Sequence, residues 1–209
     1  MYRPPAFRED RLDVLHALIQ AHPLANLVTL GPGGLQASLI PFLIEAQADG
    51  PGLLRAHLAR ANDQVEALRA GAEALVIFQG PQAYVSPGWY AAKAEHGRVV
   101  PTWNYITVQA WGRPRVIDHA AWLRGQVGDL TDAQETGRAQ PWAVSDAPSP
   151  FVEAQLRAIV GLEIPVDRIE GKWKLSQNRS GADRASVVEG LAAEGLAEIA
   201  DLVRETPLP

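Results

Sequence analysis

Turns rich in glycine and proline, set between short apolar stretches, constrain this chain most. Gly31-Pro32-Gly33-Gly34 and Asp49-Gly50-Pro51-Gly52 separate three segments whose composition predicts β-strands, at 24–30, 35–44 and 53–58. Strands that follow one another through such turns pair most simply as an antiparallel meander. Further strands are predicted at 74–79, 83–86, 102–111, 115–117, 163–169 and 172–175, with 83–86 as the hairpin partner of 74–79 across Gly80-Pro81.

Helical spacing of apolar residues is found near the N-terminus and through the second half of the chain. Leu12, Leu15, Leu18 and Ile19 predict an amphipathic helix over 8–21, which Pro23 ends. Other helices are predicted over 63–69, with Asn62 as its cap, and over 118–127, 150–159 and 183–203. This distribution indicates the α+β class. No linker is long enough to force two domains, so we expect a single domain over 1–209.

Composition limits the classes of function. The 19 Lys and Arg against 24 Asp and Glu give a net charge of −5, which does not support DNA binding, because such binding draws affinity from basic side chains. The absence of Cys excludes disulfides, thiolate metal sites and cysteine nucleophiles. No apolar stretch reaches the roughly 18 residues of a membrane span, and the N-terminus lacks the apolar core of a signal peptide. We therefore expect a soluble cytoplasmic protein without a membrane partner.

Known catalytic signatures are absent from the sequence. It contains no Walker-type phosphate loop, no G-x-G-x-x-G after a strand and no G-x-S-x-G elbow. The histidines lack the spacing of metal ligands, so no metal site is predicted.

The segment HLARAN (57–62) joins the end of a predicted strand to a short helix. Arg60 offers a planar set of donors, and Asn62 with the helix N-terminus offers amide donors, which together suit a phosphate or a carboxylate. The alternative is a helix cap beside a surface arginine, and the residues alone favour that alternative.

Two further segments combine aromatic and polar side chains. In VVPTWNY (99–105), a strand would place Thr102 and Asn104 on one face and Trp103 on the other, as a ligand wall or as an ordinary two-faced strand. GPQAYVSPGWY (80–90) carries Tyr84, Trp89 and Tyr90 among turn residues, where they would stack on a flat ligand, contact a partner subunit or form a small core.

The segment KWKLSQNR (172–179) places Lys172 and Lys174 on one face of a predicted strand and then gives four consecutive polar residues. So dense a run of donors suits an anionic ligand with polar edges. The alternative is a solvated loop.

Together with PLANLVTL (23–30), ALVIFQGP (74–81), PWAVSDAP (141–148) and AIVGLEI (158–164), these segments resemble the PaiB family from Met1 to about Leu191. The resemblance implies an FMN-binding split β-barrel, with a mostly antiparallel β core at about 23–117 and 158–176. Helical elements would flank it at 8–21, 118–160 and 183–203. It also implies a homodimer with FMN at the interface, and family members are described as negative regulators of transcription.

The resemblance also assigns candidate residues to the cofactor. It implies a phosphate site at His57, Arg60, Ala61 and Asn62. It implies ring contacts from Asn26 and from Thr102, Trp103 and Asn104, and contacts across the dimer interface from Lys174, Ser176 and Gln177. One position departs from the family, because Leu39 in ASLIPF (37–42) stands where a histidine is common. From this departure and the sparse charge at the phosphate site, we also consider that flavin binds only weakly.

We therefore predict an FMN-binding negative transcriptional regulator that works through flavin or redox sensing, with DNA as a weakly supported partner. The alternative is a flavin-dependent oxidoreductase, either an NAD(P)H:flavin reductase or an oxidase of a small molecule. A third hypothesis is a haem-binding protein of the same fold, for which His57 is the one histidine in a candidate motif.

Overall fold

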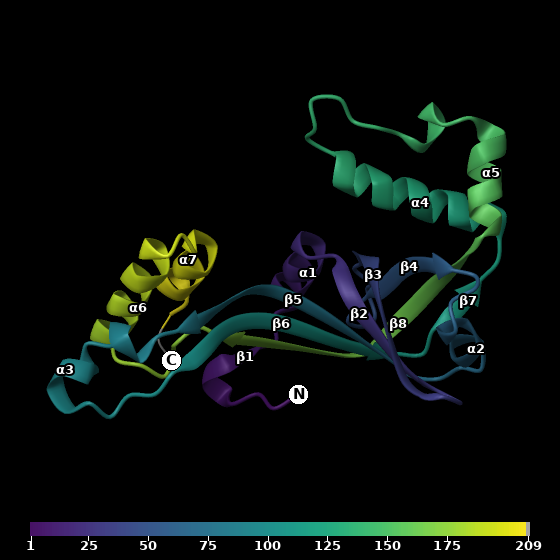
Figure 1. Ribbon diagram of the computed structural model, residues 1–209. Coiled ribbons are helices and arrows are strands. Elements are labelled where there is room, and N and C mark those ends of the chain that lie inside the picture. Colours follow the sequence, from purple (N-terminus) through teal and green to yellow (C-terminus); the bar gives the residue numbers. More distant parts are fainter. Residues whose placement is uncertain (208–209) are drawn as a thin grey trace. The chain divides into compact units, whose positions relative to one another are not determined.

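The computed structural model describes residues 1–207, which contain eight strands and seven α-helices (Figure 1). The strands are β1 (Arg8–Glu9), β2 (Leu24–Gly31), β3 (Gly34–Glu45), β4 (Leu53–Ala59), β5 (Ala74–Val85), β6 (Thr102–Gly112), β7 (Arg115–Ile117) and β8 (Ile159–Lys174). The helices are α1 (Leu12–Ala21), α2 (Gln64–Arg69), α3 (Ala92–His96), α4 (Ala120–Glu135), α5 (Ser149–Arg157), α6 (Gly181–Ala193) and α7 (Ala197–Glu205). Short 3-10 helices lie at Pro5–Phe7, Pro87–Trp89 and Val144–Asp146.

The strands follow the order β1-β8-β4-β3-β2-β5-β6, and β7 pairs with β8. A further pairing of β6 with β8 closes this order on itself, as in a β-barrel. The chain forms two compact units, one of residues 1–15, 79–108 and 170 onward, and the other of residues 16–78 and 109–169. We call them unit 1 and unit 2. The expectation of a single domain over 1–209 stays a prediction.

The core of unit 2 lies on the inner faces of β2, β4 and β5. The antiparallel register of β2 with β3 runs from Leu24 opposite Pro41 to Gly31 opposite Gly34, whose φ of +101° is a conformation that glycine adopts without strain. Phe42 and Phe78 meet edge to face with ring centroids 5.8 Å apart. The α4 and α5 helices carry a smaller cluster of buried side chains, Leu123, Val152 and Leu156.

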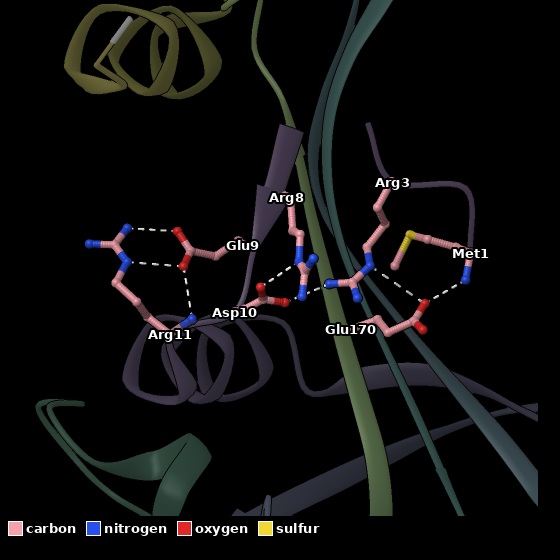
Figure 2. A network of polar contacts seen from close by, with 7 residues as sticks. All are labelled: Met1, Arg3, Arg8, Glu9, Asp10, Arg11 and Glu170. Carbon is pink, nitrogen blue, oxygen red and sulfur yellow. Dashed lines mark hydrogen bonds and ion pairs between the residues drawn. The ribbon is translucent and has the colours of Figure 1, made fainter. Parts of the chain in front are cut away.

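Unit 1 joins the N-terminal segment to the end of β8. Arg8 and Glu9 of β1 pair with Lys172 and Gly171 of β8. Ion pairs reinforce this pairing (Figure 2), and Met1 and Arg3 both contact the carboxylate of Glu170, at 2.5 and 3.7 Å. The others link Arg3 and Arg8 to Asp10, and Arg11 to Glu9.

Four expected elements differ from the observed ones. Residues 8–21 are not one helix, because 8–9 form β1 and only 12–21 are helical, a result of the distant partner strand β8. The expected hairpin at 74–86 is the single strand β5. Pro81, which cannot donate a backbone hydrogen bond, lies outside the stretch 74–77 over which β5 pairs with β2.

In the second half, β8 is one continuous strand where two were expected. The tail is two helices rather than one, and Gly195 breaks it with a φ of +78°. Among the described residues, no helix combines the length and the apolar character needed to cross a membrane.

Candidate functional site

The sequence-predicted residues fall into three places. His57, Arg60, Ala61 and Asn62 lie where β4 turns into α2 in unit 2. Thr102, Trp103, Asn104, Lys174, Ser176 and Gln177 lie at the ends of β6 and β8 in unit 1. Asn26 lies apart from the β4–α2 turn, on the outer face of β2 in unit 2.

At the β4–α2 turn, the Arg60 guanidinium is already engaged. It donates to Asp118 Oδ1 at 2.6 Å, to the Ile159 carbonyl at 2.9 Å and to the Arg157 carbonyl at 3.1 Å. Arg69 also binds Asp118, and hydrogen bonds from Arg60 and Arg69 lower the pKa of that carboxyl group. Arg60 therefore ties the end of β4 to the start of β8, and a phosphate would have to compete with these partners.

The other residues of the turn also have structural partners. Asn62 Oδ1 accepts from the Gln64 amide, and its Nδ2 donates to Ser38 Oγ, both at 2.9 Å. His57 Nδ1 is buried and has no hydrogen-bond partner among residues 1–207, and burial lowers the pKa of this imidazole. The turn nevertheless opens onto a pocket of about 560 Å³, which Arg60, Ala61 and Asn62 line.

At the β6–β8 ends, the structure brings together two segments that are far apart in the sequence. Lys174 Nζ donates to Thr102 Oγ1 and to the Trp103 carbonyl, both at 2.5 Å. The buried Asn104 amide and the Ser176 hydroxyl bind each other at 3.0 and 3.1 Å. Ser176 has a φ of +63°, so it holds the left-handed conformation that turns the chain after β8.

The turn after β8 is not a solvated loop. Gln177 is 6% exposed, and its side chain accepts from the Leu175 amide at 2.7 Å and donates to the Trp173 carbonyl at 2.6 Å. Ser176 and Gln177 therefore shape the backbone of this turn.

Three cations gather at this end of unit 1. The ammonium group of Lys172 lies 5.3 Å from the ring centroid of Tyr105, and the guanidinium of Arg179 lies 4.5 Å from that of Tyr90. Burial first, and then the charges of Lys172 and Arg179, lower the pKa of Lys174. Within residues 1–207, none of these three cations has a carboxylate within ion-pair distance. The cluster therefore favours an anion.

Two exposed aromatic rings lie near the same end of β6. Trp103 is 52% exposed and Tyr84 is 46% exposed, and their rings meet edge to face with centroids 6.0 Å apart. We call Tyr84, Trp103, Lys172, Lys174 and Arg179 the cationic–aromatic cluster. Tyr84, Lys172 and Arg179 were not among the predicted site residues, although each belongs to a segment that the sequence had singled out.

The third place is an apolar sheet face in unit 2. Asn26 pairs with Leu39 of β3 on one side and with Ile77 of β5 on the other. Large apolar side chains on the same face of β2 and β3 are more than half exposed: Leu24, Leu30, Leu35 and Leu39. We call this the outer leucine face. Leu39, the departure from the family pattern, thus lies directly beside the Asn26 that was predicted to contact the flavin.

Comparison with known protein families identifies the family of this chain. The family described as "Putative FMN-binding domain" matches residues 1–168. The chain belongs to this family. The predicted cofactor, FMN, is confirmed by this membership.

Relatives extend over nearly the whole chain. A protein of Emericella nidulans is 36% identical, with 98% of this chain and 97% of that protein covered. The "Protease synthase and sporulation protein PAI 2" of Bacillus subtilis is 30% identical over 93% of this chain and 90% of its own length. The resemblance to the PaiB family is therefore confirmed.

Solved structures agree on the fold. The "FAD and Heme binding protein" of Mycobacterium smegmatis superposes with a TM-score of 0.58 at 22% identity, covering 80% of this chain and 73% of that one. The "Flavocytochrome Anf3" of Azotobacter vinelandii gives a TM-score of 0.56 at 17% identity, covering 84% and 70%. At these identities the likeness concerns the fold alone, and it confirms the predicted α+β split β-barrel.

Proposed function

We propose that this protein binds FMN with the phosphate at the cationic–aromatic cluster. The observation that carries the proposal is the group of three cations, Lys172, Lys174 and Arg179, without carboxylate partners among residues 1–207. A phosphate would supply the missing negative charge and favour the protonated form of Lys174, whose pKa is lowered.

The neighbouring aromatic residues fit the rest of the cofactor. Trp103 and Tyr84 offer exposed ring surface near the start of β6, and a planar isoalloxazine is a partner for such rings. Thr102 and the Trp103 carbonyl hold Lys174 in place through its two hydrogen bonds. When bound, FMN supplies the redox chemistry.

A phosphate at the β4–α2 turn, through Arg60, Ala61 and Asn62, is the second placement. The 560 Å³ pocket supports it, whereas the engagement of the Arg60 guanidinium by Asp118 and two carbonyls weakens it.

The outer leucine face is proposed as the surface that binds a second copy of this chain. Four leucines on this one sheet face are each more than half exposed. Single exposed apolar residues are common on protein surfaces, whereas a contiguous group of this kind marks an interaction surface. In a homodimer Asn26 and Leu39 would lie at the interface, where the prediction placed the flavin ring.

The regulatory role rests on the Bacillus subtilis relative, whose name refers to protease synthesis and sporulation. A repressor in the cytoplasm that senses the flavin or its redox state remains our proposal for this chain. The net charge of −5 leaves DNA as its least supported partner.

The test is a titration of FMN fluorescence with wild-type protein and three variants. Lys174→Ala removes a phosphate contact and is expected to weaken binding about tenfold or more. Arg60→Ala is expected to change affinity little. Lys93→Ala, which removes an exposed lysine on α3 of the same unit, is the control.

The outcomes separate the two placements of the phosphate. Weakening by Arg60→Ala but not by Lys174→Ala would move the phosphate to the β4–α2 turn. Absence of FMN binding by the wild type would overturn the proposal. Consumption of NAD(P)H by the FMN-loaded protein would support the oxidoreductase alternative over a sensor.

A further inference from the structure

A groove lies between α4 and α5 in unit 2, and of the residues assigned to FMN it includes Arg60. Its volume is about 990 Å³, at the upper end of the roughly 300–1,000 Å³ of small-molecule sites. In Figure 1, α5 lies at one end of α4 and runs across its direction. Small residues and leucines of the two helices line the groove. These are Ala120, Ala121, Leu123 and Gly125 of α4 and Leu156 of α5.

Gly125 of α4 leaves space open in the groove, because it has no side chain. A Cβ atom built on Gly125 would meet no heavy atom within 4 Å, so nothing fills the groove beside this residue. Leu123 and Leu156, by contrast, are buried, and they belong to the small core that joins α4 to α5. The floor of the groove is therefore apolar and fixed in position.

Charged residues surround this apolar floor. Arg60, Arg124 and Arg157 line the groove together with Asp118 and Glu153. Both acids already have arginine partners, since Asp118 binds Arg60 at 2.6 Å and Glu153 lies 3.9 Å from Arg124. Among the ion pairs of residues 1–207, Arg157 has no carboxylate partner. Three arginines and two acids leave one net positive charge.

This combination selects the chemistry of a ligand. An apolar floor favours an alkyl or aryl body, and a single unbalanced arginine favours one negative charge. A doubly charged phosphate would bring more negative charge than the one unbalanced arginine offsets. We propose that the α4–α5 groove binds a small amphipathic monocarboxylate, with its apolar body over Leu123 and Leu156 and its carboxylate at Arg157.

The experiment is calorimetric titration with decanoate, and with decanamide as its uncharged analogue. Gly125→Leu fills the groove, and it should not disturb the fold because the site is open and leucine is the better helix former. Gly128→Leu is the matched control, since Gly128 lies on the same helix in equally open space but does not line the groove. Arg157→Gln removes the charge that would hold the carboxylate.

We expect decanoate to bind the wild type about tenfold or more tightly than decanamide. Gly125→Leu should weaken both ligands by a similar factor, Arg157→Gln should weaken decanoate alone, and Gly128→Leu should weaken neither. The proposal would be overturned if Gly125→Leu and Gly128→Leu weakened decanoate binding equally, or if the wild type did not bind decanoate. Binding to vesicles of anionic lipid that Arg157→Gln abolishes, without binding of free decanoate, would also overturn it in favour of a membrane surface. FMN affinity should be unchanged in Gly125→Leu, so this test is independent of the flavin site.

Discussion

At the scale of single residues, unit 1 is organised by one buried polar pair. Asn104 is fully buried and its amide has Ser176 Oγ as its side-chain partner. Ser176 makes this contact from a left-handed backbone conformation, with a φ of +63°. We therefore expect the hydrogen bonds of the Ser176 hydroxyl to contribute more stability than the left-handed conformation costs.

Two substitutions at Ser176 separate these contributions. Ser176→Ala keeps the strained backbone and leaves the Asn104 amide without its partner, at an expected cost of about 1–3 kcal/mol in free energy of unfolding. Ser176→Gly removes the same contact but relieves the backbone strain, so it should lower the free energy of unfolding by about 1 kcal/mol less than Ser176→Ala does. Urea denaturation of the three proteins measures the order. Equal stability of wild type and Ser176→Ala would show that the pair contributes nothing.

At the scale of elements, local patterns predicted most strands and the order of helices, because alternation and turn residues act over a few positions. The elements that were predicted wrongly depend on partners that are distant in the sequence. Arg8 and Glu9 become a strand only because Lys172 and Gly171 lie beside them, and the sequence near residue 8 carries no sign of that partner. Likewise Asn104 and Ser176 meet across more than seventy positions, so spacing alone gave no reason to join their segments. The family resemblance assigned Asn104 to the flavin ring and Ser176 to a contact across a dimer interface, and it did not predict that the two bind each other within one chain.

The packing of α4 on the sheet depends on one glycine. A Cβ atom built on Gly161 of β8 would lie 2.1 Å from the Trp122 ring, and the Trp122 indole donates to Glu163 at 2.8 Å. Gly161→Ala should therefore displace the ring and cost about 1–3 kcal/mol in free energy of unfolding. Gly128→Ala, in open space on the same helix, should instead stabilise by about 1 kcal/mol. Urea denaturation measures the stability change of each variant.

A double-mutant cycle identifies why Gly161→Ala lowers stability. If the clash with Trp122 is responsible, most of the cost of Gly161→Ala disappears in a Trp122→Ala background. An undiminished cost would place the effect in the β8 backbone instead.

At the scale of the whole molecule, the exposed leucines of β2 and β3 form the surface that we propose binds a second copy of the chain. Leu35 is 78% exposed and Leu39 is 58% exposed, on a face where alternation leaves the opposite side of the sheet for the core. Leu39 adds apolar area to this surface directly opposite Asn26 of β2.

The double variant Leu35→Glu/Leu39→Glu tests this association. Two carboxylates on a sheet face that is buried in a dimer would have to be desolvated without partners, so sedimentation equilibrium should show a dimer for the wild type and a monomer for the variant. Phe151→Glu, at a position 57% exposed on α5, should leave the wild-type mass unchanged. A wild type that sediments as a monomer would contradict the proposed dimer. A monomeric double variant that still binds FMN with wild-type affinity would place the flavin site within one chain, because the cofactor would then need no residue from the second copy.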